Sequence, residues 1–332
     1  MIDFTATTHP GNRYQHNEDA IGWSEEAGIW FVADGIGGHA RGDLASAIVK
    51  KTLLAAPTEP QIPLKQLVLL AHEAVLLEAI EQSLTNMGST LVLARINGNR
   101  LNIAWCGDSR AYLWRRGKLN RLTRDHSLLE QLLESGVVTP EEAFGHPRRN
   151  VLVQALGINE PPPRPSEISL TLDNGDVLLL CSDGVHDELH DSHICDVLTA
   201  KSASATSSQA IVDELERRVL ATDARDNLSV ICLCFSGLSQ KKAKPAQDKL
   251  AQDKLAQDRA DTNSAPTVQR SAVSTRRRTV ESQIESQIER QKLTSESAQS
   301  FEDLNVNHVS SKFFWLALAG FGLLLGFVLL LF

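Results

Sequence analysis

Residues 29–46 decide the fold and read I-W-F-V-A-D-G-I-G-G-H-A-R-G-D-L-A-S. The apolar run 29–33 is short and continuous, which predicts a buried strand. The run ends at the pair 34–35, Asp-Gly, where we expect the strand to give way to a loop. A helix is predicted over 44–56, because Pro57 cannot continue it. This stretch therefore predicts a buried strand that ends on a carboxylate.

The same alternation of strands and helices continues to residue 236. Apolar residues at helical spacing, Asn-Gly and Arg-Gly turn pairs, and a capping box at 139–142 predict the elements. The predicted helices are 64–84, one or more within 125–150, and one near 207–220; the predicted strands are 90–96, 100–105, a hairpin within 108–122 turning at 116–117, 177–181 and 228–235. This order fits an α+β fold, a two-sheet antiparallel β-sandwich flanked by helices.

Composition excludes several classes of protein. The chain has 332 residues and a net charge of −8, with no basic stripe interleaved with aromatics, so nucleic acid is not expected as a partner. The five cysteines are odd in number and show no C-x-x-C spacing. This pattern predicts a reducing compartment, without a disulfide framework or a zinc site.

The last third of the chain differs from the rest. Residues 237–311 are polar and carry A-Q-D-K-L and E-S-Q-I repeats, which predicts a disordered linker. Residues 312–332 include about twenty consecutive apolar residues, enough to cross the hydrocarbon core of a bilayer as one helix. With no secretory signal at the N-terminus, we expect a single-pass membrane protein with domain 1–236 in the cytoplasm.

Five aspartates follow or flank short apolar runs of the sequence. They are Asp19, Asp34, Asp108, Asp183 and Asp226. One such residue is ordinary turn chemistry, but five suggest strand ends that converge on one acidic site. Clustered carboxylates repel one another unless a cation compensates. Oxygen ligands without His or Cys favour Mg²⁺ or Mn²⁺, and two such ions can activate a water towards a phosphoryl group.

Six motifs in one unbroken order resemble the protein phosphatase 2C family of metal-dependent serine/threonine phosphatases. They are R-Y-Q-H-N-E-D at 13–19, the stretch 31–46, G-S-T at 88–90, C-G-D-S-R-A-Y-L at 106–113, L-L-L-C-S-D-G-V at 178–185 and D-N-L-S-V at 226–230. The resemblance covers residues 1–236, and the spacing of the motifs is similar to that of the compact bacterial form of the family. It implies hydrolysis of phosphoserine and phosphothreonine in proteins, opposite a serine/threonine kinase.

The resemblance also implies the metal ligands. Asp34 would bridge two Mn²⁺ or Mg²⁺ ions, and the backbone carbonyl of Gly35 would bind one of them. Asp183 and Asp226 would hold the other ion. Asp108, together with Asp183, resembles the ligands of a third, weaker metal site.

Other matching residues are implied to act around the metals. Glu18 and Asp19 would position metal-bound waters or add ligands. Arg13 matches the guanidinium that grips the substrate phosphate, and His39 resembles the general acid that protonates the leaving oxygen. The stretch 125–150 corresponds to a flap beside the active site. Two interpretations stay open for His146, Arg148 and Arg149 in this flap: they contact substrate, or they are solvated loop residues.

The remaining histidines are interpreted as surface or structural residues. Residues 186–190, H-D-E-L-H, place two histidines four apart, but the zinc-protease pattern needs Glu directly after the first His, where Asp187 stands. The histidines without partners at ligand spacing are His9, His16, His72, His126, His193 and His308.

A competing hypothesis is a membrane-tethered module that binds phosphoproteins without turnover. The long linker and the apolar end suit such a scaffold. The complete set of aspartates favours the enzyme. Expected partners are phosphorylated proteins, including membrane-bound kinases or their targets.

Overall fold

A computed structural model describes residues 2–37, 41–56, 62–84, 86–143, 146–158, 162–202 and 207–238. The chain divides into two compact units, Met1–Pro266 and Thr267–Phe332, and every described residue belongs to the first. The predicted linker from residue 239 onwards and the predicted membrane helix at 312–332 lie outside the described residues. Within the described ranges, no helix is long and apolar enough to cross a bilayer.

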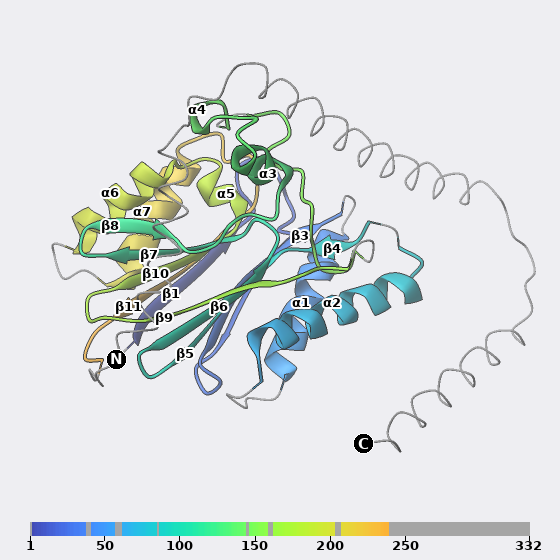
Figure 1. Ribbon diagram of the computed structural model, residues 1–332, viewed down its shortest axis with the longest axis horizontal. Helices are drawn as coiled ribbons and strands as arrows, with labels where there is room; N and C mark the ends of the chain where they lie inside the picture. Colours follow the sequence, from blue (N-terminus) through green and yellow to red (C-terminus); the bar gives the residue numbers. More distant parts are fainter. Residues whose placement is uncertain are drawn as a thin grey trace, which may run out of the picture. The chain divides into compact units, whose positions relative to one another are not determined.

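Two antiparallel sheets form the centre of the domain (Figure 1). One sheet has the strand order β1-β11-β10-β7-β8, and the other has the order β2-β3-β5-β6-β9, with the short β4 paired to β3. The strands are β1 Ile2–His9, β2 Asp19–Ser24, β3 Ile29–Ile36, β4 Gly88–Ser89, β5 Leu91–Asn97, β6 Arg100–Cys106, β7 Arg110–Arg115, β8 Lys118–Arg121, β9 Ser166–Thr171, β10 Val177–Cys181 and β11 Leu228–Phe235.

Helices cover the outer face of each sheet. In Figure 1, α1 and α2 lie beside the β3 sheet, and α6 and α7 lie beside the β10 sheet. The helices are α1 Gly42–Ala55, α2 Leu64–Glu81, α3 Leu128–Glu134, α4 Pro140–Ala143, α5 Asp183–His186, α6 Asp191–Ser202 and α7 Ser208–Leu220. The predicted helix-flanked sandwich is confirmed for the described residues.

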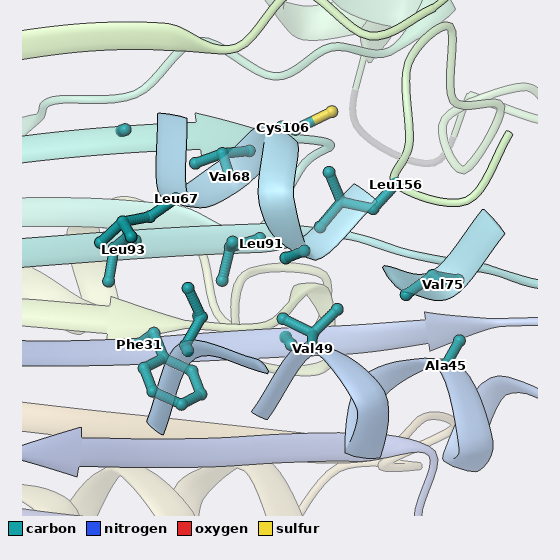
Figure 2. Close-up of a cluster of buried hydrophobic side chains, with 14 of the residues drawn as sticks. Phe31, Ala45, Val49, Leu67, Val68, Val75, Leu91, Leu93, Cys106 and Leu156 are labelled. Atoms are coloured by element: carbon teal, nitrogen blue, oxygen red, sulfur yellow. The ribbon is translucent and has the colours of Figure 1, made fainter. Parts of the chain in front are cut away.

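Three apolar clusters separate these layers because side chains alternate along each strand. In β3, Phe31 faces α1 and α2, whereas Trp30 and Val32 face the opposite sheet. In β10, Leu179 faces α7 and Leu180 faces the other sheet. Strands covered on both faces need apolar side chains at every position, which explains their continuous apolar runs. Figure 2 shows the cluster beneath α1 and α2.

One strand boundary differs from the expectation. The predicted loop at 34–35 is wrong, because β3 continues to Ile36. Gly35 pairs with Ser89 and Ile36 with Gly88, so β4 extends the ladder past the apolar run. Hydrogen bonding to a two-residue partner, rather than hydrophobicity, therefore sets the end of this strand.

The predicted hairpins are confirmed, with one small shift. Arg116 and Gly117 both have positive φ, as a type I′ turn requires. In the other hairpin, Asn97 still pairs with Arg100, so the turn is formed by residues 98–99 and not 97–98. The predicted capping box at 139–142 is present: the Thr139 N–H donates to Glu142 at 3.0 Å and the Glu142 N–H donates to Thr139 at 3.3 Å.

Candidate metal centre

Five aspartates lie at the same end of the sandwich, where several strands begin or end. Asp19 begins β2 and pairs across the ladder with Asp34 near the end of β3. Asp108 follows β6, Asp183 begins α5 directly after β10, and Asp226 precedes β11. Because neighbouring strands are antiparallel, the starts of β2 and β11 lie at the same edge as the ends of β3, β6 and β10. The predicted convergence of strand-end aspartates is therefore present in the structure.

The backbone of Asp34 is held by the segment 88–90. The Asp34 N–H donates to Thr90 Oγ1 at 3.1 Å, and the Thr90 N–H donates to the Asp34 carbonyl at 2.8 Å. The Ser89 hydroxyl donates to the same carbonyl at 3.1 Å. The G-S-T motif thus fixes the main chain beneath this carboxylate.

Glycines allow Glu18 to lie against the start of α1. The Gly35 N–H donates to the Glu18 carbonyl at 3.1 Å. A Cβ atom on Gly35 would lie 2.0 Å from the carbonyl oxygen of Gly42, and a Cβ atom on Gly42 would lie 2.3 Å from Glu18 Oε2. No side chain fits at either glycine, so this part of the 31–46 motif is required by close backbone approach.

Hydrogen bonds from β10 and β11 fix the other side of the centre. The Ser182 hydroxyl donates to Asp19 Oδ2 at 2.7 Å and accepts the Ser229 N–H at 2.9 Å. Asn227 accepts the N–H of Glu18 at 2.7 Å, and its amide donates to two carbonyls of the segment 10–16. Asn227 therefore ties the loop that carries Glu18 to the start of β11.

The surroundings of the aspartates disfavour ionisation of their carboxyl groups. Burial raises the pKa of Asp34 and Asp183 well above the usual range, and neighbouring carboxylates raise it further. Burial also raises the pKa of Asp19 to about 6, although hydrogen bonds from Ser182 and Ser229 oppose it. Burial and the charge of Asp125 raise the pKa of Asp108 to about 7. At neutral pH this group of carboxylates calls for a compensating cation.

Two carboxylate oxygens provide a direct test of that fit. Asp19 Oδ1 and Asp183 Oδ1 are buried and have no hydrogen-bond partner among the described residues. Buried oxygens without partners carry a desolvation cost that a cation removes. In the described ranges, no three acidic, His or Cys side chains are arranged around one point as ligands. Mg²⁺ sites often use only one or two carboxylates and several waters, so the aspartates present fit such ions.

The other predicted site residues are placed as follows. Arg13 is exposed, and its guanidinium lies 3.6 Å from Asp223. His39 lies outside the described residues. In the flap, Arg149 pairs with Asp187 at 3.1 Å, whereas Arg148 is exposed and solvated.

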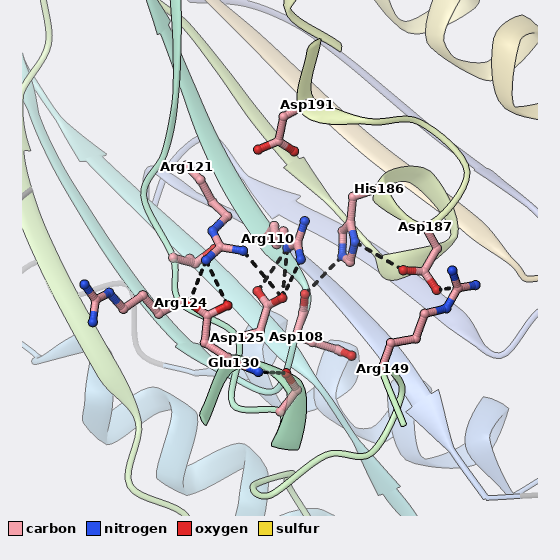
Figure 3. A network of polar contacts seen from close by, with 12 residues as sticks. Asp108, Arg110, Arg121, Arg124, Asp125, Glu130, Arg149, His186, Asp187 and Asp191 are labelled. Atoms are coloured by element: carbon pink, nitrogen blue, oxygen red, sulfur yellow. Dashed lines mark hydrogen bonds and ion pairs between the residues drawn. The ribbon is translucent and has the colours of Figure 1, made fainter. Parts of the chain in front are cut away.

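A polar network that sequence reasoning missed joins the flap to the metal centre (Figure 3). Arg110 donates from Nε to both carboxylate oxygens of Asp125 at 3.0 and 3.1 Å, and from Nη1 to the Tyr112 hydroxyl at 3.0 Å. The Tyr112 hydroxyl donates to Asp191 at 2.9 Å. Burial opposes ionisation of Asp125, but Arg110 and Arg121 outweigh it and lower the pKa of Asp125 to about 2.

His186 lies at the inner end of this network. Its side chain is only 4% exposed, and Nε2 lies 3.2 Å from the carbonyl oxygen of Asp108. Burial, with the nearby charge of Arg110, lowers the pKa of His186 well below its usual value, so the ring is neutral. A neutral ring forms no ion pair with Asp187, whose Oδ1 is 3.7 Å from Nδ1. His72 and His126 also form buried contacts, to the backbones of Gly157 and Gly107, which agrees with a structural role.

The network lines a pocket of about 390 Å³ between the flap and α5–α6. Its walls carry Arg110, Arg121 and Arg149 together with the acids that pair with them. Asp108 and His186 line its inner side. The flap thus contacts the elements that carry the metal-centre aspartates.

Known proteins resemble this chain in sequence and fold. The family Protein phosphatase 2C matches residues 9–229. Serine/threonine phosphatase stp of Listeria welshimeri is 33% identical over 247 residues, covering 70% of this chain and 96% of that protein. PppA of Pseudomonas aeruginosa, described as a key regulatory component of the T6SS, is 36% identical with a TM-score of 0.62, covering 70% of this chain and 97% of that structure. The PstP catalytic domain, solved with 2 manganese ions, is 29% identical with a TM-score of 0.61, covering 71% and 98%.

A helix-flanked sandwich with aspartates at one edge, matched to these proteins, defines the class of metal-dependent serine/threonine phosphatases. Within that class, the chain belongs to the protein phosphatase 2C family. The resemblance that the six motifs indicate is thereby confirmed.

Proposed function

We propose that this protein hydrolyses phosphoserine and phosphothreonine in proteins at a dinuclear Mn²⁺ or Mg²⁺ centre. The observation that carries the proposal is the convergence of five aspartates, two of them with buried oxygens that lack partners. Such a group is unfavourable by itself and becomes favourable around divalent ions. When bound, the two ions activate a water and stabilise charge on the phosphoryl group.

The chain's own residues have distinct tasks in this proposal. Asp34, the Gly35 carbonyl, Asp183 and Asp226 hold the two ions. Ser182 orients Asp19 through a 2.7 Å hydrogen bond, so that Asp19 offers its other oxygen to the centre. Hydrogen bonds such as that from Ser182 preorganise the carboxylates before substrate binds.

Residues of the surrounding loops act on the substrate. Arg13 is exposed and only distantly paired with Asp223, so its guanidinium is free to turn towards a phosphate. Glu18 lies beside Gly42 and positions waters at the centre. His39 is proposed as the general acid for the leaving oxygen, and Asp108 with Asp183 as the ligands of a third, weaker ion.

Phosphate release tests the proposal directly. A phosphothreonine peptide and p-nitrophenyl phosphate are assayed with Mn²⁺, with EDTA, and with the Asp34→Asn and Asp183→Asn variants. We expect EDTA and each substitution to remove nearly all activity. Full activity in EDTA and in both variants would refute the metal mechanism, whereas metal and phosphopeptide binding without turnover in the unsubstituted protein would support the binding-module alternative.

We propose in addition that residues 312–332 anchor the protein in a membrane with the phosphatase domain on the cytoplasmic side. The support is the apolar composition of these residues and the absence of charge from Phe313 to Phe332. A linker of residues 237–311 would let the domain reach phosphoproteins near the bilayer, including membrane-bound kinases or their targets.

A further inference from the structure

Two histidines hold the turn that carries Asp108. Gly107 has a φ of +101°, and its N–H donates to His126 Nδ1 at 3.3 Å. The Gly107 carbonyl accepts the N–H of His126 at 2.9 Å. From the other side, His186 Nε2 lies 3.2 Å from the carbonyl oxygen of Asp108. The turn is therefore fixed both by the segment that leads into α3 and by the end of α5.

The contact from His186 links two carboxylates through one short element. Asp183 is the first residue of α5 and His186 is the last, so they lie about one helical turn apart on the same element. Asp108 and His186 line the same side of the pocket beside α5. Figure 3 shows the His186 ring pointing from α5 towards Asp108. The hydrogen bond between His186 and the Asp108 carbonyl thus connects the helix that carries Asp183 to the turn that carries Asp108.

We infer that His186 is a positioning residue of the metal centre. Its Nε2–H holds the backbone of Asp108 against α5 and thereby sets the separation of the Asp108 and Asp183 carboxylates. The inference rests on the proposed function, because it assumes that these carboxylates bind divalent ions. His186 acts through Asp108 and is not itself a ligand.

The chemistry of the contact suits a neutral histidine. The Asp108 carbonyl only accepts hydrogen bonds, so Nε2 must carry the proton. The closer partner of Asp187 is Arg149, at 3.1 Å, whereas His186 Nδ1 lies 3.7 Å from it. A neutral donor holds the turn without adding a positive charge that would repel divalent ions.

Mn²⁺ binding to the purified full chain tests the inference independently of activity. Isothermal titration and Mn²⁺ EPR give the number of bound ions and their affinities. His186→Leu fills a similar volume without a donor, and we expect it to weaken at least one ion by roughly 10- to 100-fold, as loss of a residue that orients a metal ligand usually does. His186→Gln presents an N–H near the Nε2 position and is expected to recover most of the affinity.

A double substitution separates positioning from general destabilisation. If His186 acts through Asp108, His186→Leu has little further effect on Mn²⁺ affinity in an Asp108→Asn background. The matched control is His193→Leu, at an exposed position of α6, which should leave the Mn²⁺ isotherm unchanged. If His186→Leu does not fold, comparison of His186→Gln with His186→Asn decides, because the shorter Asn amide cannot reach the Asp108 carbonyl.

Two results would overturn the inference. One is a Mn²⁺ isotherm of His186→Leu that matches the unsubstituted chain; the other is an equal loss of affinity with and without Asp108→Asn. If the folding comparison is needed, equal Mn²⁺ affinity of His186→Gln and His186→Asn would also overturn it. Failure of the proposed function has a different signature: the unsubstituted chain would show no turnover, or its phosphatase activity would survive Asp34→Asn.

Discussion

At the scale of single residues, the carboxylates are positioned by neighbours that contact main-chain atoms. Thr90 and Ser89 hold the backbone of Asp34, Asn227 holds that of Glu18, and His186 contacts that of Asp108. The aspartates could be predicted from sequence because each follows or flanks an apolar run, and several stand beside glycine. His186 could not, because its partner lies 78 positions away and the five-residue motif around it suggested only an unlikely zinc pattern.

Gly184→Ala tests how closely α5 packs on β11. A Cβ atom there would lie 2.0 Å from the carbonyl oxygen of Asn227, so α5 must shift and move Asp183 with it. We expect the free energy of unfolding to fall by about 1–3 kcal/mol, the usual cost of overpacking, and more Mn²⁺ to be needed for half-maximal activity. Denaturant unfolding and a Mn²⁺ titration of activity measure the two effects.

Gly117→Ala is the matched control for this substitution. Nothing lies within 4 Å of its Cβ position, but its φ of +80° disfavours alanine. Its cost of about 1–2 kcal/mol should therefore appear in unfolding and leave the Mn²⁺ dependence unchanged. A Gly184→Ala protein with the stability and Mn²⁺ dependence of the parent would contradict the proposed packing.

At the scale of elements, the sequence predicts best the strands that are buried on both faces. β3, β10 and β11 are continuous apolar runs and were predicted. The strands β1, β2 and β9 were missed because they lie at sheet edges and are only partly buried. In β1 the alternation of Ile2, Phe4 and Ala6, which pack into the core between the sheets, is a signal that could have found it.

The Arg110–Asp125 pair joins β7 to the beginning of the flap, and its stability should depend on pH. Because the pKa of Asp125 falls to about 2 on folding, from about 3.9 in an unfolded chain, the pair stabilises the fold above pH 4. This contribution, about 2.6 kcal/mol, is lost as the pH falls from about 4 to about 2. Asp125→Asn should cost about 3–5 kcal/mol at neutral pH, because Arg110 stays buried without its partner.

Urea unfolding at several pH values measures this effect. The control is Asp173→Asn, which removes a more exposed carboxylate that pairs with Arg116 at 3.3 Å and should cost less than about 1 kcal/mol. Equal losses for Asp125→Asn and Asp173→Asn at pH 7 would be inconsistent with a stabilising role for the buried pair.

At the scale of the whole molecule, deletion of residues 312–332 tests the proposed anchor. We expect the truncated protein to leave the membrane fraction and appear in the soluble fraction, because the apolar segment is the proposed attachment. The rate on p-nitrophenyl phosphate should stay the same, since these residues lie far in sequence from the metal centre. Cell fractionation with immunoblotting and a phosphatase assay measures both; an unchanged membrane fraction would refute the anchor.

When no ions are bound, the buried carboxylates of the metal centre are expected to destabilise the domain. The pKa of Asp19 rises to about 6 and that of Asp108 to about 7 on folding, so the folded state holds more protons than the unfolded chain between about pH 4 and these values. Stability of the metal-free protein should therefore decrease as the pH rises from about 4 to about 7. Function thus conflicts with stability at this edge of the sandwich.

The most direct measurement is the unfolding temperature of the full chain at pH 7.5 in EDTA and in Mn²⁺, with and without Asp183→Asn. Ions at a hundredfold excess over their dissociation constant stabilise by about 2.7 kcal/mol, so Mn²⁺ should raise the midpoint by about 5–10 °C. Asp183→Asn should raise the midpoint in EDTA by removing a buried charge, and abolish most of the Mn²⁺ effect. Identical midpoints in EDTA and Mn²⁺, with a lower midpoint for Asp183→Asn in EDTA, would contradict a carboxylate cluster held together by metal.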